Sequence, residues 1–242
     1  MPRLFLIFII VGLSQTLTGQ FSADFSTDDL SDWQGDVSTF IVNASQQLQL
    51  NGSETSTAGI YTALDFPDSL RWSIDVLLDF EPSGSNSLVI WLAVDDFNSD
   101  NPTGYKLELG ETGSNDAINF IWVDAGTENL IAQGDMGQVA EAFALQFIVT
   151  KDADDVWTLA TRDLGSVAEE ESFSVLFEDN FLSMAGEFGL VCDYTSSRAT
   201  LFSFDNIRIE ELLPDTAGPI FCLLYTSPSP RDATLSRMPS SA

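Results

Sequence analysis

The feature that most constrains this chain is a period-two alternation of apolar and polar residues, repeated in short segments from Phe21 to Glu210. In the clearest segment, residues 71–80, the apolar side chains of Trp72, Ile74 and Val76 alternate with polar ones. Clusters of Gly, Asn, Asp, Ser and Pro separate the segments. Short alternating runs divided by turn residues are typical of strands in an all-β sandwich. We therefore predict an antiparallel β-sandwich of the jelly-roll type, with no helix longer than a turn or two.

The same pattern places further strands along the chain. They are expected in segments 88–94, 105–109, 118–123, 143–150, 156–160, 186–194 and 201–210. In the last segment the apolar residues change phase, which predicts a β-bulge at Asp205 and Asn206. The pair Asn51-Gly52 is a hairpin-type turn signal.

The chain contains no histidine and carries 37 acidic against 9 basic side chains, for a net charge of −28. Histidine is the commonest general base and metal ligand, so its absence favours binding or a structural role over catalysis. A strongly negative field repels phosphate backbones and anionic lipid surfaces, which excludes nucleic acid as a partner. Such a surface is typical of solubility outside the cell, and it also suits divalent cations.

Residues 1–19 have the pattern of a secretory signal peptide, with a positive charge at Arg3, an apolar run from Leu4 to Leu13 and a polar stretch up to Gly19. The apolar run is shorter than the roughly 20 residues that a membrane-spanning helix needs, and no later run reaches that length. We therefore expect a secreted or cell-surface protein that is exported through its signal peptide and does not insert directly into the membrane. The sandwich is expected over residues 20–213.

The composition changes after the expected sandwich. Residues 214–221 contain Pro214 and Pro219, which stop the strand pattern, and we interpret this segment as a linker to a missing downstream domain. Residues 222–242 are rich in Ser and Pro and resemble a translated sequencing-adaptor read-through, so we interpret them as an artefactual, disordered tail. A natural flexible Ser/Pro tail is the alternative. On the first interpretation the chain is a fragment of a larger protein.

Several strand signatures carry a resemblance to a known group of proteins. They include Phe21-Ser-Ala-Asp-Phe25, Trp33-Gln-Gly-Asp36, Phe80-Glu-Pro-Ser83 and Phe204-Asp-Asn-Ile207. With them, residues 20–213 resemble the N-terminal module of large secreted surface proteins of the Bacteroidetes, whose larger members carry Ig-like and lamin-tail domains downstream. These modules look like concanavalin A-like lectin/glucanase (laminin G-like) sandwiches. The resemblance implies a lectin-like fold and a carbohydrate-binding or adhesive function.

Some members of this fold are glycosidases, which place two glutamates and an aspartate on one strand as Glu-x-Asp-x-x-Glu. This string is absent from the sequence. The nearest carboxylates on one strand face, Asp75 and Asp79, stand four residues apart, which is about 13 Å and too far for a catalytic pair. We therefore predict no catalytic residues and no enzymatic activity, with a glycoside hydrolase-like enzyme as a distant alternative.

Aromatic side chains that line a groove can stack on sugar rings, so the tryptophans are candidates for ligand binding. Trp91 and Trp122, together with Tyr105, are the candidates to test, because we expect their strands to line the concave sheet. Core packing is the alternative role for all three side chains. The leading hypothesis is a lectin-like module that binds a polysaccharide or cell-surface glycan. The alternative is a structural spacer or interaction module without a glycan site.

The loop of residues 95–101 is the best candidate for a metal site. Asp96, Asn98 and Asp100 supply oxygen atoms at alternating positions, which is the kind of spacing that calcium loops use. The loop is not an EF-hand, because Asn101 stands where that motif has Gly. A polar turn capped by its own Asp and Asn side chains is the alternative to calcium binding. No other cofactor is predicted.

Overall fold

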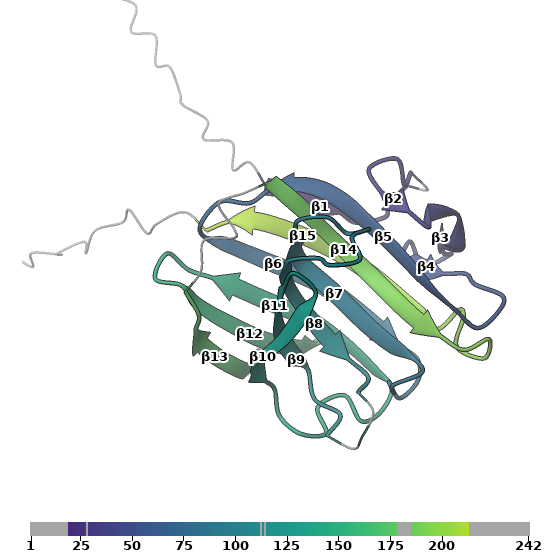
Figure 1. Cartoon of the computed structure of the whole chain (residues 1–242). Helices are drawn as coiled ribbons and strands as arrows, with labels where there is room; N and C mark the ends of the chain where they lie inside the picture. The colour runs from purple at the N-terminus through teal and green to yellow at the C-terminus, as the bar shows by residue number, and fades with distance from the viewer. Residues whose placement is uncertain (1–18, 28, 112, 114, 179–184, 213–242) are drawn as a thin grey trace, which may run out of the picture. The chain divides into compact units, whose positions relative to one another are not determined.

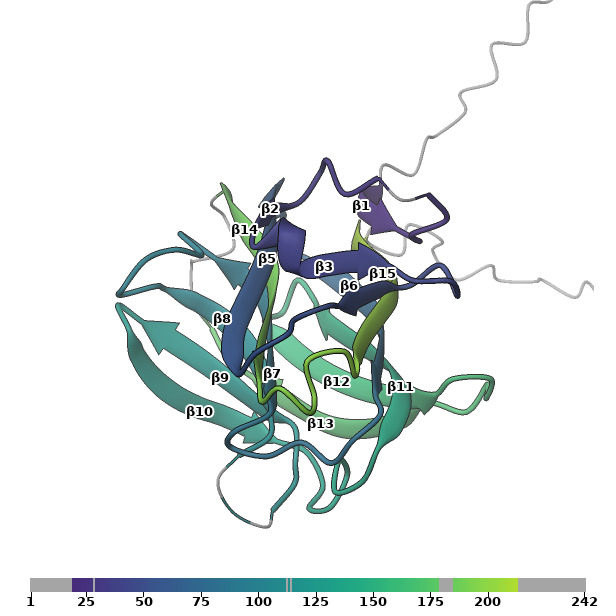
Figure 2. The ribbon, with the colours of Figure 1, turned by 90° about the vertical axis from the view of Figure 1, so that its right-hand side faces the viewer.

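The strands pair into two antiparallel sheets that pack face to face (Figure 1). The structure is a computed structural model that describes residues 19–27, 29–111, 113, 115–178 and 185–212. Within these residues the only helix is a three-residue 3-10 helix, η1 (Val37–Thr39). Figure 2 shows the two sheets as separate layers. The predicted all-β antiparallel sandwich is therefore confirmed.

Eight strands make up the first sheet. They are β1 (Gly19–Ala23), β3 (Phe40–Val42), β4 (Leu48–Leu50), β6 (Leu70–Leu78), β11 (Phe143–Lys151), β12 (Val156–Asp163), β13 (Glu170–Leu176) and β15 (Phe202–Glu211). Their order is β13-β12-β11-β6-β15-β4-β3, and β1 pairs with β15 outside this path.

The second sheet has seven strands. They are β2 (Gln34–Gly35), β5 (Ser56–Asp65), β7 (Ser87–Val94), β8 (Gly104–Leu109), β9 (Asn119–Asp124), β10 (Thr127–Gln133) and β14 (Ala185–Tyr194). Their order is β10-β9-β8-β7-β14-β5-β2. The three segments that carry the candidate aromatics, β7, β8 and β9, are direct neighbours in this sheet.

The core lies between the sheets and is made of the side chains that alternation turns inward. In β6, Trp72, Ile74 and Val76 are fully buried, whereas Arg71 and Ser73 on the opposite face are partly exposed. The largest fully buried side chains are mostly aromatic and include Trp72, Trp157, Tyr105, Phe120, Phe147, Phe188, Phe202 and Phe204. Large aromatic rings bury the most apolar area per residue, so this cluster contributes strongly to the stability of the sandwich.

A side-chain hydrogen bond joins the two sheets through the core. Trp72 Nε1 in β6 donates to the backbone carbonyl of Leu92 in β7, at 2.9 Å. The register of β7 shifts at this point against both of its neighbours, which leaves Leu92 outside the regular ladder. A buried carbonyl that loses its ladder partner needs another donor, and the indole supplies it.

Two local predictions had different outcomes. The β-bulge is confirmed, because the pairing of β15 with β6 shifts between Asp205 and Arg208, and Asn206 has a φ of 47°. The hairpin at Asn51-Gly52 is wrong, because β4 belongs to the first sheet and β5 to the second. Gly52 instead packs under the ring of Tyr194, where a Cβ would lie 2.6 Å from a ring carbon. This glycine is explained by a close approach and not by a tight turn.

The expected processing and linker segments fall largely outside the described residues. These are residues 1–18 of the signal peptide, the linker at 214–221 and the tail at 222–242. The domain boundaries proposed from the sequence therefore stay predictions. In the described part of the chain, no helix has the length and apolarity that crossing a bilayer requires.

Candidate functional site

The three candidate aromatics lie on opposite faces of the seven-stranded sheet. Tyr105 pairs with Trp122 across β8 and β9, and both rings face the core, 4.7 Å apart between centroids. Tyr105 is fully buried and also lies 4.4 Å from the ring of Trp157. The structure corrects the prediction for Tyr105, since its ring has no exposed face to offer a sugar. Trp122 is partly buried against the same core, so both residues take the core-packing role.

Trp91 lies on the outer face of the same sheet and is only partly buried. It pairs with Lys106 of β8, whose Nζ stands 5.9 Å from the centroid of the indole ring. A cation at this distance from a tryptophan ring is attracted by the negative face of its π system. Trp91 is therefore the one candidate of the three whose ring belongs to the outer face.

The Lys106 side chain is held on the outer face by two carboxylates. Its Nζ lies 2.7 Å from an oxygen of Glu108 and 2.6 Å from one of Glu128, and Lys106 itself is almost fully buried. Burial alone lowers the pKa of Lys106, but the hydrogen bonds and charges of Glu108 and Glu128 outweigh it and raise the pKa above its ordinary value. Lys106 is thus a fixed positive charge beside Trp91 at all pH values below its ordinary pKa.

The Lys106 ion pairs predict a specific pH dependence of stability. Because the pKa of Lys106 is raised on folding, its contribution is fully present below pH 10.5, the unfolded value, and is lost as the pH rises through the folded value. Replacing Lys106 with Met keeps the apolar stem and removes the charge. We expect the stability difference between the wild type and Lys106→Met to shrink above pH 10.5, measured by urea unfolding across that range. A difference that stays constant with pH would contradict this assignment.

The loop between β7 and β8 folds back over the outer face. The ring of Phe97 stacks on Tyr61 of β5, with centroids 4.8 Å apart, and covers Gly59 and Gly189. A Cβ at Gly59 would lie 2.9 Å from the Phe97 ring, and one at Gly189 would overlap it. Tyr61, Gly189 and Trp91 follow one another across the strands. We call Tyr61, Phe97 and Trp91 the aromatic row.

Sequence reasoning missed Tyr61 and Phe97 as members of this face. The signal that could have found them is the pair of glycines inside two strands, Gly59 in β5 and Gly189 in β14. A glycine in a strand interior often marks a place where another group approaches the backbone closely.

The loop that carries Asp96, Asn98 and Asp100 is closed by hydrogen bonds of its own. Asp96 Oδ1 accepts from the backbone N–H of Asn98 at 3.0 Å, and Asn98 Nδ2 donates to the hydroxyl of Tyr61 at 2.9 Å. Asp100 is exposed. In the described residues no group of three or more His, Cys, Asp or Glu side chains converges as a metal site. The geometry matches the polar turn, and calcium at these residues stays a prediction.

A shallow polar groove of about 390 Å³ continues the outer face beyond Trp91. At its base, the carboxylate of Asp193 in β14 accepts hydrogen bonds from the hydroxyls of Thr57 and Ser87, the latter at 3.2 Å. Asp193 pairs with Ser87, and Gly189 pairs with Trp91, so the groove lies four residues along the strands from the indole. That spacing is roughly 13 Å along the strands.

The fold and this face can be compared with solved structures. The carbohydrate recognition domain of Emp47p is similar with a TM-score of 0.60 at 13% identity, covering 79% of this chain and 95% of that one. The exoplasmic/lumenal domain of VIP36, in a Ca2+/Man3GlcNAc-bound form, gives 0.58 at 12% identity and covers 76% and 84%. This chain has the concanavalin A-like lectin fold.

A third similar structure is bacterial, the carbohydrate binding module CBM66 from Bacillus subtilis. It matches with a TM-score of 0.50 at 14% identity and covers 74% of this chain and 96% of that one. No protein-family model matches the sequence, and no curated protein matches it either. The likeness is therefore one of fold.

Proposed function

We propose that this chain is a non-catalytic, lectin-like module that binds carbohydrate on the outer face of its seven-stranded sheet. The observation that carries the proposal is Trp91, a partly exposed indole on that face, with the polar groove of Asp193 further along the same strands. An aromatic platform on the same face as hydroxyl and carboxylate groups is the usual chemistry of a sugar site. The fold shared with carbohydrate recognition domains of other proteins supports this proposal.

The proposal includes the setting of the module. We place it outside the cell, secreted or on the cell surface after export through its signal peptide, as the N-terminal part of a larger surface protein. Its partner would be a polysaccharide or a cell-surface glycan. The net charge of −28 favours neutral or cationic polymers over acidic ones, because the field of the protein repels anions.

A structural spacer without a glycan site is the competing function. It is favoured by the inward packing of several large aromatic side chains, which turns them toward the core and away from the outer face. These are Trp72, Trp157, Tyr105 and Trp122. An enzyme is the more distant competitor. Among the described residues, the buried carboxylate is that of Asp75, and it accepts hydrogen bonds from the amides of Gln146 and Asn206 at 2.8 and 2.9 Å, as a structural group does.

The test is affinity electrophoresis of the chain in gels that contain a panel of soluble polysaccharides. We expect retardation by at least one neutral polymer, and we expect Trp91→Ala to weaken it about tenfold because the stacking surface is lost. Val167→Ala is the matched control, since Val167 is 93% exposed and lies away from this face in the loop before β13. If the folded wild type is not retarded by any polymer, the spacer function stands and the sugar site is refuted.

Calcium is tested in the same gels. We propose that Asp96, Asn98 and Asp100 hold a calcium ion, because carboxylate and amide oxygens are the ligands that calcium takes. The VIP36 domain is described in Ca2+-bound forms, which supports the proposal. Retardation that needs added calcium in the wild type, and that is lost in Asp96→Asn, is the expected result. Equal retardation with calcium and with a chelator would reject the metal while leaving the sugar site intact.

A further inference from the structure

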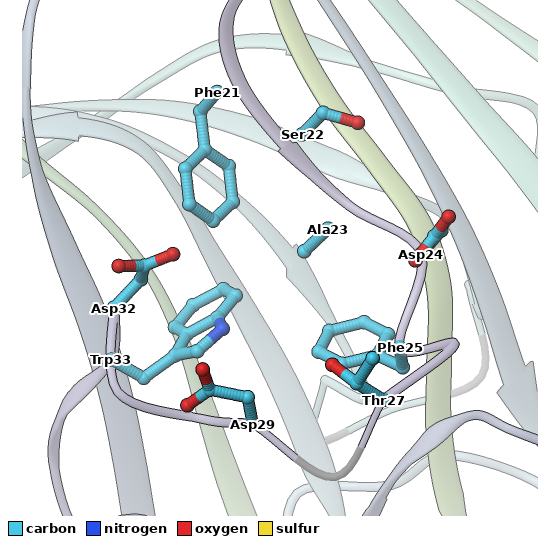
Figure 3. Close-up of a pocket in the computed structure, with 9 residues that line it drawn as sticks. All are labelled: Phe21, Ser22, Ala23, Asp24, Phe25, Thr27, Asp29, Asp32 and Trp33. Carbon is cyan, nitrogen blue, oxygen red and sulfur yellow. The ribbon is translucent and has the colours of Figure 1, made fainter.

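A second pocket lies away from the aromatic row, where the chain passes from β1 in the first sheet to β2 in the second (Figure 3). Its volume is about 160 Å³. It is lined by Phe21, Ser22, Ala23, Asp24, Phe25, Thr27, Asp29, Asp32 and Trp33. No residue of the proposed sugar site contributes to it.

Three aromatic rings form the base of this pocket. Trp33 and Phe25 are each 5% exposed, and their rings stack with centroids 6.4 Å apart. Phe21 meets Trp33 edge to face at 5.5 Å, and Phe188 of β14 supports Trp33 from the core side at 6.2 Å. The indole ring is therefore fixed in place by its aromatic neighbours.

The nitrogen of this indole lacks an acceptor. Trp33 Nε1 donates no hydrogen bond to any of the described residues, in contrast to Trp72, whose Nε1 reaches the carbonyl of Leu92. Figure 3 shows the nitrogen edge of Trp33 on the side of the pocket that holds Phe25 and Asp29. Trp33 is nearly buried, but its N–H is open to the pocket, so an oxygen atom of a ligand in the pocket can accept a hydrogen bond from it.

Three exposed carboxylates surround the rings. Asp29 and Asp32 stand beside Trp33, and Asp24 stands across the pocket near Phe25 (Figure 3). One oxygen of Asp24 accepts from the N–H of Ser26 at 3.1 Å, and one of Asp29 accepts from that of Ser31 at 2.9 Å. These bonds lower the pKa of both Asp24 and Asp29, so both are ionised at neutral pH.

The charge at the pocket is left largely uncompensated. Arg208 of β15 is the basic group that acts on Asp24, and its effect is the smallest of those that lower the pKa of that residue. In the described part of the chain, no salt bridge involves Asp24, Asp29 or Asp32. A positive ligand group would relieve their repulsion.

We propose that this pocket binds a small organic ammonium ion that also carries hydroxyl groups, as in an amino sugar with a free amine. The ammonium group lies beside Trp33, close to the carboxylates of Asp29 and Asp32 and facing that of Asp24 across the pocket. A hydroxyl oxygen accepts the hydrogen bond from Trp33 Nε1, and the other hydroxyls donate to the free carboxylate oxygens. A neutral sugar would satisfy the indole and leave the three negative charges unopposed, whereas a simple cation would leave the indole unpaired.

The test follows the indole N–H signals of the full nitrogen-15-labelled chain by NMR during titration with glucosamine. The chain has five tryptophans, and Trp33→Phe identifies the Trp33 signal by its disappearance. We expect a saturable shift of that signal with glucosamine. N-acetylglucosamine and glucose, which lack the charge, are expected to bind at least tenfold more weakly, and added salt is expected to weaken the glucosamine shift.

Variants test whether glucosamine binding depends on the side chains of the pocket. Asp29→Asn and Asp32→Asn are exposed changes that keep the shape of the pocket, and each is expected to weaken glucosamine binding several-fold. Asp124→Asn, an exposed change in the second sheet, removes the same charge elsewhere and is expected to have no effect. Trp91→Ala is also expected to leave the titration unchanged, which keeps this site distinguishable from the outer face. An absent shift, equal shifts with glucose, or equal losses in Asp29→Asn and Asp124→Asn would each overturn the proposal.

Discussion

Replacing Trp72 with alanine is expected to lower the free energy of unfolding by about 3–5 kcal/mol, a large part of the stability of an ordinary domain. Trp72 is fully buried between the sheets and stacks on Trp157 with centroids 5.7 Å apart. The substitution opens a cavity at the centre of the aromatic cluster and removes the hydrogen bond to Leu92. Chemical denaturation followed by circular dichroism measures the loss.

A matched pair of substitutions isolates the hydrogen bond from the packing. Trp72→Phe and Trp157→Phe remove the same atoms from two fully buried indoles in one cluster. The Nε1 of Trp157 has no hydrogen-bond partner among the described residues, whereas that of Trp72 bonds to the Leu92 carbonyl. We expect Trp72→Phe to cost about 1–3 kcal/mol more, because it leaves that carbonyl buried and unpaired. Equal costs would mean that the carbonyl finds another donor.

The sequence was sufficient to predict the strands of this fold because their pattern is local. In β6 the alternation of Trp72, Ile74 and Val76 with polar residues identifies the buried face without knowledge of any neighbour. The bulge at Asn206 was equally visible as a change of phase. The strand order was not predictable in this way. Asn51-Gly52 has the chemistry of a hairpin, but the strands on either side of it pair in different sheets.

The candidate site was less predictable, because it depends on which face of each strand is covered. Both faces of β7 are apolar, so its pattern alone does not tell whether Trp91 or Leu92 faces the core. The strand pairing decides it. Trp91 pairs with Lys106 on the outer face, whereas the neighbouring residue Tyr105 pairs with Trp122 on the face that packs against the core. The pocket around Trp33 was not predicted at all. Most of its residues come from the connection between β1 and β2, where side chains follow no period.

A single methyl group at Gly104 is expected to separate two paired strands. A Cβ at this position would overlap the carbonyl oxygen of Ala93 and lie 2.8 Å from the Cα of Val94, both in the backbone of β7. Backbone atoms in a ladder cannot rotate away as a side-chain end can, so relief requires β8 to move off β7. We expect Gly104→Ala to cost about 3 kcal/mol, at the upper end of the range for overpacking.

The matched control for Gly104→Ala is Gly113→Ala, where the nearest atom to the new Cβ is a flexible side-chain oxygen of Glu111 at 3.8 Å. It is expected to change the free energy of unfolding by less than about 0.5 kcal/mol. Because β8 also carries Lys106, a shift of this strand would disturb the surroundings of Trp91. Gly104→Ala is therefore expected to weaken polysaccharide retardation as well as stability. A variant that loses stability but keeps full retardation would show that the outer face does not depend on the register of β7 with β8.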